Sequence, residues 1–225
     1  MEQTGRLYLC ATPIGNLGDI TYRAVETLRA ADLIAAEDTR HTRGLLAHYD
    51  IHTPMTSYHE HNKDEKGAEL IARMQAGETV VCVSDAGLPG IADPGGDLAR
   101  RAIAAGIRVT PLPGANAALS ALICAGLPLE GFTFVGFLPR KEKKRREVLA
   151  RVAAYPETLI FYEAPHRLKE TLAALADGLG EERRACAARE LTKKFEEFRR
   201  TTLGELHAYY NENEPRGEFV LIVAG

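Results

Sequence analysis

Asp85 is a carboxylate placed where an α/β protein would hold a ligand. It follows the apolar run at residues 80–83 almost directly and opens a segment rich in glycine and proline. A short apolar run bounded by such residues predicts a buried strand that ends in a loop. Ligands bind beyond the carboxyl ends of strands in open sheets, so Asp85 could hold a ribose hydroxyl or an amine, with Gly87 and Gly90 allowing close backbone approach. A tight loop that only caps a helix at residues 93–97 is the alternative.

The elements that must position this loop alternate between short apolar runs and helical patterns. In the first half, strands are expected at residues 6–11, 33–36, 54–58, 79–83 and 108–112, and helices at residues 19–31, 39–48, 63–75 and 97–105. Such alternation predicts a mostly parallel sheet that is covered on both faces. Each expected strand leads into a polar or Gly/Pro loop, and in a parallel sheet all five loops share one edge. We expect the functional edge of the protein there.

The second half is expected to form a smaller domain around a mixed sheet. Its strands are expected at residues 132–137, 158–162, 184–190 and 218–224, and its helices at residues 116–125, 141–153, 166–176 and 203–210, while residues 197–202 are ambiguous. Closely spaced turn signals near the end favour hairpins. We place the domain boundary within residues 113–118, which gives domains at residues 1–114 and 115–225. The predicted fold class is α/β, with a mostly parallel doubly wound sheet followed by a smaller mixed-sheet domain.

Composition restricts the function classes. The formal net charge of the 225-residue chain is −3, so any contact with nucleic acid must come from a local basic surface. The four cysteines lie far apart without a Cys-x-x-Cys pair, which suggests a reducing compartment, and we expect them to be buried. The first apolar run is too short for a signal peptide, and no stretch approaches the length of a membrane span. We expect a cytoplasmic protein.

One strongly basic segment, residues 140–146, could supply such a local surface. It contains one carboxylate and six cations, which are Arg140, Lys141, Lys143, Lys144, Arg145 and Arg146. The segment is either the solvated start of a helix or a contact for the phosphate backbone of RNA. Charge alone leaves both interpretations open.

Several common chemistries are disfavoured by the sequence. His59 and His61 would share a face if they lay on a strand, but no His-Glu-x-x-His or Cys/His ligand spacing is present, so no metal site is expected. The Gly-x-Ser-x-Gly pattern of serine hydrolases is missing. Neither a Walker A sequence nor a Gly-x-Gly-x-x-Gly follows the first expected strand, which argues against common ATP and dinucleotide sites.

Five segments resemble a known family. They read LCATPIGNLGDI at residues 9–20, AEDTR at 36–40, SDAGLPGIADPG at 84–95, FYEAPHR at 161–167 and ARELTK at 188–193. In this order they resemble the bacterial small-subunit ribosomal RNA cytidine-2′-O-methyltransferases, within the tetrapyrrole methylase superfamily. The resemblance covers essentially the whole chain. Family members commonly carry a further small C-terminal domain, whereas the sequence here ends at Gly225.

The resemblance implies a homodimeric enzyme that uses S-adenosylmethionine, held between two α/β domains, to methylate RNA of the small ribosomal subunit. The first domain would face the RNA and form half of the cofactor cleft, which the second domain completes. By position in the motifs, the implied cofactor-binding residues are Pro13, Ile14, Asp85, Ala86, Gly87, Leu88, Asn116, Ala117, Tyr162, Glu163 and Leu191.

A 2′-hydroxyl must lose its proton during methyl transfer, so a nearby proton acceptor helps. Glu37, Asp38 and Glu190 are candidates on the expected loops, with His59 as a further option. Arg40 and Lys193 could hold a phosphate or steady the developing alkoxide. Asp38 could equally be a helix N-cap, and the two cations could be surface ion pairs.

Two other functions remain open at this level. One is a tetrapyrrole C-methyltransferase on the same scaffold, although the loops around Asn16 and Arg40 argue against it. The other is a non-catalytic RNA-binding protein of ribosome assembly that keeps the fold.

Overall fold

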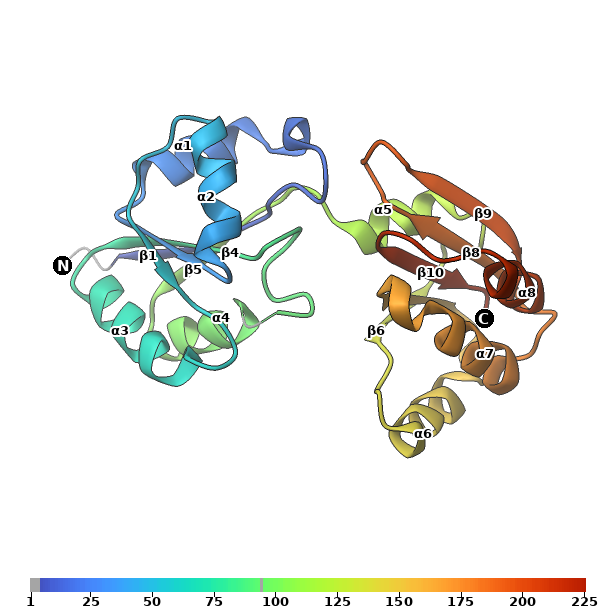
Figure 1. Cartoon of the computed structure of the whole chain (residues 1–225). Helices are drawn as coiled ribbons and strands as arrows, with labels where there is room; N and C mark the ends of the chain where they lie inside the picture. Colours follow the sequence, from blue (N-terminus) through green and yellow to red (C-terminus); the bar gives the residue numbers. More distant parts are fainter. Residues whose placement is uncertain (1–4, 94) are drawn as a thin grey trace. The chain divides into compact units, whose positions relative to one another are not determined.

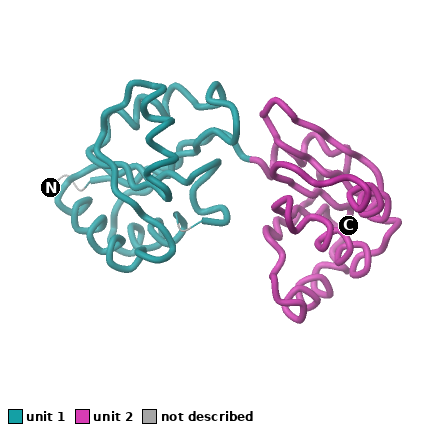
Figure 2. The backbone as a smooth tube through the Cα atoms, in the orientation of Figure 1, with its two compact units in different colours: residues 1–116 teal, residues 117–225 magenta. Residues whose placement is uncertain are grey.

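The computed structural model describes residues 5–93 and 95–225. This chain divides into two compact units, residues 1–116 and residues 117–225 (Figures 1 and 2). The division after residue 116 falls within the range of residues 113–118 in which the sequence places the boundary. In the described residues, no helix is long and apolar enough to cross a membrane.

Unit 1 is built on a parallel sheet with the strand order β3-β2-β4-β1-β5. Its strands are β1 (Arg6–Cys10), β2 (Leu33–Ala36), β3 (Met55–Ser57), β4 (Thr79–Val83) and β5 (Arg108–Leu112). Its helices are η1 (Leu17–Asp19), α1 (Tyr22–Ala30), α2 (Thr39–His48), α3 (Lys63–Gln75) and α4 (Gly95–Ala104). The described strands all run in one direction, as predicted, so their carboxyl ends share one edge.

Both faces of this sheet are buried under helices, which explains why its strands are largely apolar (Figure 1). On β4, Val80 and Cys82 face the cluster that includes Leu70 of α3 and Leu98 of α4. Val81 and Val83 face the opposite cluster, to which α1 and α2 contribute. The unit is therefore doubly wound.

Unit 2 contains a mixed sheet with the strand order β6-β7-β10-β8-β9. Its strands are β6 (Phe132–Phe137), β7 (Thr158–Glu163), β8 (Arg184–Arg189), β9 (Glu197–Thr202) and β10 (Phe219–Val223). Its helices are α5 (Ala117–Cys124), α6 (Glu142–Val152), η2 (Pro165–Arg167), α7 (Leu168–Leu179) and α8 (Leu203–Glu212). β6 and β7 are parallel, while β10 is antiparallel to β7 and β8, and β9 is antiparallel to β8. The ambiguous segment is thus an edge strand.

The core of unit 2 lies on one face of its sheet. Leucines of α7, together with Leu149 of α6 and Leu206 of α8, pack there against Phe161 and Leu221. Helix α5 packs against β7 and β10 and buries Ala121 and Leu122. Figure 1 shows α5 on the side of the sheet opposite to α6, α7 and α8.

Local capping corrects some predicted boundaries. The helix expected from residue 19 begins at Tyr22, because the Thr21 side chain accepts a hydrogen bond from the backbone N–H of Ala24. His59 and His61 lie in a turn after β3 instead of on a strand, so the alternation of a strand does not relate them. Cys124, expected to be buried, is exposed at the end of α5, whereas Cys10, Cys82 and Cys186 are buried.

Candidate functional site

Two loops at the carboxyl edge of the unit 1 sheet are joined by backbone hydrogen bonds. Thr12, after β1, and Gly87, after β4, exchange two N–H···O bonds of 2.9 and 3.0 Å. The Thr12 hydroxyl also donates to the carbonyl oxygen of Ser84 at 3.1 Å. These bonds hold the Thr12–Pro13 corner against the loop that begins with Asp85.

Gly87 is the position where three loops meet. Its φ of +82° lies in the left-handed region, which favours glycine. A Cβ atom there would lie 3.5 Å from Cγ2 of Ile14 and 3.6 Å from the carbonyl oxygen of Ala115. The loops after β1, β4 and β5 therefore surround one residue, and the predicted gathering of these loops is confirmed.

Glycine is required at positions 90 and 95 by contacts within the loop itself. A Cβ atom on Gly95 would approach the Gly90 nitrogen to 2.8 Å, and Gly90 has a φ of +95°. Oδ1 of Asp93 accepts hydrogen bonds from both backbone N–H groups, at 2.6 and 2.8 Å. This part of the loop is folded on itself around Asp93, as in the capping alternative.

A reciprocal pair of hydrogen bonds connects the loops after β2 and β4. The backbone N–H of Asp38 donates to Oδ1 of Asp85 at 3.0 Å, and the backbone N–H of Asp85 donates to Oε2 of Glu37 at 3.3 Å. Asp85 thus positions both acidic residues of the β2 loop. One oxygen of its carboxylate therefore already accepts a hydrogen bond from the protein.

The carboxylates of this edge have different pKa shifts. Burial raises the pKa of Glu37, and the negative charges of Asp85, Asp93 and Asp38 add to the rise, although the Asp85 N–H acts in the opposite direction. Burial likewise raises the pKa of Asp93. Hydrogen bonds from Arg40 lower the pKa of Asp38 to about 2. Glu37 is therefore the better proton acceptor of the two predicted on this loop.

Asp38 and Arg40 have the structural roles that the sequence left open. Oδ1 of Asp38 accepts the backbone N–H of Arg40 at 2.8 Å and caps α2. The Arg40 guanidinium bonds the same carboxylate at 2.8 Å, while its side chain stays 85% exposed. An exposed pair of this kind stabilises the fold little, so Arg40 remains accessible to an anion.

The loop after β3 contributes a histidine with an unused nitrogen. Within the described part of the chain, the buried Nδ1 of His59 has no hydrogen-bond partner, and its ring centroid lies 6.0 Å from that of His61. The described residues contain no group of three His, Cys, Asp or Glu side chains that could hold a metal ion. His59 therefore stays a candidate for hydrogen bonding.

In unit 2, Tyr162 and Glu163 end strand β7. The Tyr162 hydroxyl accepts the backbone N–H of Ala118 at 3.2 Å, and burial raises its pKa. The Glu163 carboxylate is buried and accepts hydrogen bonds from the Thr171 hydroxyl and the Ala164 N–H, at 2.5 and 2.9 Å. Its carboxylate thus supports the fold, and only its backbone remains suited to the predicted ligand contact.

The loop after β8 is held by an ion-pair network. Nζ of Lys193 lies 2.9 Å from Glu190 and 2.8 Å from Glu218. Burial favours a higher pKa for Glu190, but Lys193 and the Glu218 N–H outweigh it, so the pKa is lowered. Glu190 is thus a weaker base than expected. Leu191 is buried between two residues with positive φ, Glu190 at +50° and Thr192 at +66°.

Together, these observations describe an edge that holds half-buried carboxylates on loops fixed by backbone bonds. Such a site favours a cationic ligand and can accept a proton. A sequence model described as "Tetrapyrrole (Corrin/Porphyrin) Methylases" matches residues 6–207. The chain belongs to this methylase family.

The chain is similar to named proteins in sequence and to a solved structure in fold. Proteins named "Ribosomal RNA small subunit methyltransferase I" from Synechocystis sp. and Bacillus subtilis are 54% and 52% identical. Each match covers 98% of this chain, and 79% and 75% of the relatives respectively. A crystal structure of uroporphyrin-III C-methyltransferase from Thermus thermophilus aligns with a TM-score of 0.68 at 21% identity, over 98% of this chain and 97% of that one. This likeness supports the fold alone.

The basic segment of this methylase divides into exposed and buried cations. Arg145 is 9% exposed, and its guanidinium lies 2.6 Å from Glu170 of α7. The prediction that Arg145 contacts RNA is therefore corrected: packing against α7 commits it to the fold. Arg140, Lys141, Lys143 and Lys144 are largely exposed, and Arg146 is exposed but pairs with Glu142 at 2.5 Å.

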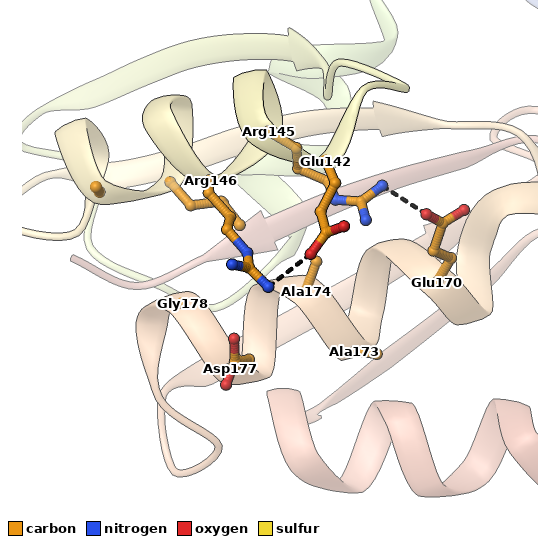
Figure 3. A pocket seen from close by; sticks show the side chains of 10 residues that line it. Glu142, Arg145, Arg146, Glu170, Ala173, Ala174, Asp177 and Gly178 are labelled. Carbon is orange, nitrogen blue, oxygen red and sulfur yellow. Dashed lines mark hydrogen bonds and ion pairs between the residues drawn. The ribbon is translucent and has the colours of Figure 1, made fainter.

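A pocket of about 470 Å³ lies between α6 and α7 (Figure 3). Its two arginines each meet a glutamate, Arg145 with Glu170 and Arg146 with Glu142, and Asp177 adds a third carboxylate. Because its charges are compensated internally, this pocket is a poor match for an anionic ligand.

Sequence reasoning did not single out Thr12 in the methylase edge, and it considered Asp93 only within the helix cap at residues 93–97. Thr12 joins two loops through its backbone and hydroxyl, and Asp93 organises the loop around Gly90. The signal for Asp93 is that an Asp side chain often accepts the backbone N–H two residues on, which here belongs to Gly95. Nothing local marked Thr12, because its partners lie 72 residues or more away.

Proposed function

We propose that this protein transfers a methyl group from S-adenosylmethionine to the 2′-hydroxyl of a cytidine in small-subunit ribosomal RNA. The observation that carries the proposal is the carboxyl edge of unit 1, where the Glu37 carboxylate accepts the backbone N–H of Asp85 and the Asp85 carboxylate accepts the backbone N–H of Asp38. The names of the relatives at 52 to 54% identity support an RNA substrate.

The carboxylates at this edge of the sheet are suited to the proposed cofactor. S-Adenosylmethionine supplies an electrophilic methyl group on a positively charged sulfur. Half-buried carboxylates lower the electrostatic cost of such a charge, and carboxylates also accept ribose hydroxyls. In unit 1 the residues proposed to hold the cofactor are Pro13, Ile14, Asp85, Ala86, Gly87, Leu88 and Asn116. In unit 2 they are Ala117, Tyr162, Glu163 and Leu191.

Glu37 is our proposed proton acceptor for the 2′-hydroxyl. Its pKa is raised, which brings it closer to the pH at which the enzyme works and makes it a better general base. Arg40, exposed at the start of α2, would hold an RNA phosphate. Asp38 and Glu190 have lowered pKa values, so they are assigned to structure.

Exposed cations at the start of α6 are proposed to contact the RNA backbone. These are Arg140, Lys141, Lys143 and Lys144. Arg146 would join them once its ion pair with Glu142 is broken. Phosphate contacts of this kind position an RNA without reading its sequence.

We also propose a cytoplasmic homodimer. Unit 2 exposes Leu119 and Ile123 on α5 together with Phe132 and Phe134 on β6, to between 37 and 69%. Exposed apolar side chains are common at interaction surfaces, and a second copy of the chain is the partner that we propose. Assembling ribosomal subunits would supply the substrate in the cytoplasm.

One assay separates this function from its alternatives. Labelled S-adenosylmethionine is offered with immature small ribosomal subunits, with naked ribosomal RNA, or with a porphyrinogen. We expect label in a ribose of the RNA, and most of it on subunit particles. Label in the porphyrinogen would establish a tetrapyrrole C-methyltransferase. Label in none of them, alongside RNA binding, would establish a non-catalytic assembly protein.

A further inference from the structure

The hairpin that joins β8 to β9 presents an aromatic ring to solvent. Phe195 is 63% exposed, more than any other phenylalanine among the described residues. It lies in the loop at residues 190–196, next to Lys194, whose Nζ is 5.5 Å from the centroid of the Phe195 ring. An exposed aromatic ring offers a flat face on which a base can stack.

Hydrogen bonds and ion pairs order the backbone of this loop around Phe195. The backbone N–H of Thr192 donates to Oε2 of Glu196 at 2.6 Å, and Nη2 of Arg189 donates to the Phe195 carbonyl oxygen at 3.3 Å. Lys193 is fixed by the carboxylates of Glu190 and Glu218. The positive φ angles at Glu190 and Thr192 show that the loop keeps a strained backbone, which is typical of functional sites.

The hairpin carries an excess of cations, and Lys194 lies beside the ring. Residues 189–200 contain five Lys and Arg against three Glu, in a chain whose net charge is −3. Among the described residues, no ion pair is seen for Lys194, whereas the Arg200 guanidinium donates to the carbonyl oxygen of Cys124 at 2.7 and 3.0 Å. An exposed ring beside this lysine, on an ordered loop, matches the way proteins bind single-stranded nucleic acid, by stacking bases and neutralising phosphates.

We infer that Phe195 stacks on an unpaired base of the RNA substrate while Lys194 contacts the adjoining phosphate. The inference rests on the proposed function, and it adds a contact on β8–β9 to those proposed on α2 and α6. Stacking tolerates any base, so this contact positions the RNA strand and leaves the choice of nucleotide to other groups.

A single substitution turns the ring into a reporter. The chain contains no tryptophan, so Phe195→Trp creates a protein with one tryptophan at the proposed contact. We expect its fluorescence to be quenched when a cytidine-containing single-stranded RNA of about 12 nucleotides is added. Tyr22→Trp, at an exposed tyrosine on α1 of unit 1, is the control and should respond far less. Inorganic polyphosphate should quench neither protein, because it has charge without bases.

Binding and kinetics give a second test that does not depend on the reporter. Phe195→Ala should raise the KM for RNA by roughly 5- to 150-fold, the range expected when one base loses its stacking partner, with a smaller change in kcat. Phe195→Tyr should restore binding, whereas Phe195→Leu should not. Lys194→Gln should reduce the salt dependence of RNA binding by about 0.7 in slope, while Phe195→Ala leaves the slope unchanged.

Several outcomes would overturn the inference while leaving the proposed function intact. Unchanged KM in Phe195→Ala, with normal methylation of RNA by the wild type, would do so. Quenching of Phe195→Trp by S-adenosylhomocysteine alone would instead assign the ring to the cofactor. A change of oligomeric state in Phe195→Ala would assign it to a second copy. By contrast, a wild type that methylates only a porphyrinogen would remove the proposed function itself.

Discussion

Two neighbouring carboxylates on one loop have opposite electrostatic surroundings. Glu37 is half-buried near three other carboxylates, while Asp38 is bonded to Arg40. The sequence placed both at the functional edge but could not rank them, because the ranking depends on burial and on Asp85 and Asp93, which come much later in the chain. The same is true of Arg145, whose partner Glu170 belongs to another helix.

Glu37→Gln should lower methyl transfer by about 10²- to 10⁴-fold, the usual contribution of a general base, with little change in cofactor affinity. Wild-type activity should rise with pH through the raised pKa of Glu37, since the ionised form is the acceptor. That rise should be lost in the variant. Rates of label transfer across pH measure both effects.

Asp38→Asn is the matched control, because its carboxylate is on the same loop but has a lowered pKa. It should weaken the cap of α2 by about 1 kcal/mol and keep the pH-dependent rise in rate. If Asp38→Asn loses this rise and Glu37→Gln keeps it, Asp38 would be the proton acceptor and Glu37 the structural residue.

Thermal stability supplies a further check on Glu37. Folding raises its pKa, so the folded state favours the protonated form, and the associated stability is lost as pH rises from the ordinary value of 4.5 through the raised one. Glutamine resembles the protonated form. At neutral pH, Glu37→Gln should therefore melt at the same temperature as the wild type or higher; a clear decrease would show that the carboxylate supports the fold.

Asp85→Ala should weaken or abolish cofactor binding. Its Oδ1 holds the backbone of the β2 loop, and losing a hydrogen bond to a charged acceptor costs about 1.5–3 kcal/mol, or roughly 10- to 150-fold in affinity when the loop forms the site. Asp85→Asn keeps an acceptor oxygen and should lose less. Calorimetry with S-adenosylhomocysteine measures both; equal affinity in Asp85→Ala and wild type would contradict the role.

At the scale of elements, hydrophobic periodicity was highly informative. The strand at residues 79–83 and the helices at 39–48 and 63–75 have the predicted bounds, because apolar runs and amphipathic faces determine burial on both sides of the sheet. The edge strand β9 was ambiguous because it is mostly polar and half-exposed. Side-chain caps such as Thr21 moved helix starts by a few residues.

Helix α6 offers a test of the proposed RNA contact. Replacing Arg140, Lys141, Lys143 and Lys144 by Gln should weaken RNA binding and reduce the slope of log affinity against log salt by about 0.7 to 0.9 for each phosphate that is no longer neutralised. Filter binding at several salt concentrations measures this slope. Arg151→Gln, near the other end of the same helix, is the control for general charge.

Arg145→Gln should behave differently from those surface variants. Arg145 is buried against α7, so replacing it removes packing as well as the pair with the exposed Glu170. The melting temperature should fall, while the salt slope for RNA stays close to that of the wild type. An unchanged melting temperature with a reduced slope would return Arg145 to the RNA-binding set.

At the scale of the whole molecule, the proposed dimer makes a prediction about surface chemistry. Ile123→Glu should convert the protein to a monomer, because a carboxylate in an apolar interface must be desolvated without a partner. Ile103→Glu is the matched control, since Ile103 is similarly exposed on α4 of unit 1 but has no proposed interface role. Sedimentation velocity gives the state of each, and a monomeric wild type would contradict the proposal.

The strand order of unit 1 also constrains how the chain is made. β1 lies between β4 and β5, so this strand has no neighbour during synthesis until residue 79 has followed it, while β2 and β3 can pair much earlier. Pairings so distant along the chain form slowly. Until β4 has emerged, the nascent chain therefore carries an apolar segment, Arg6–Cys10, with no strand to shield it. An enzyme proposed to mature ribosomes would itself present this unpaired strand while still attached to one.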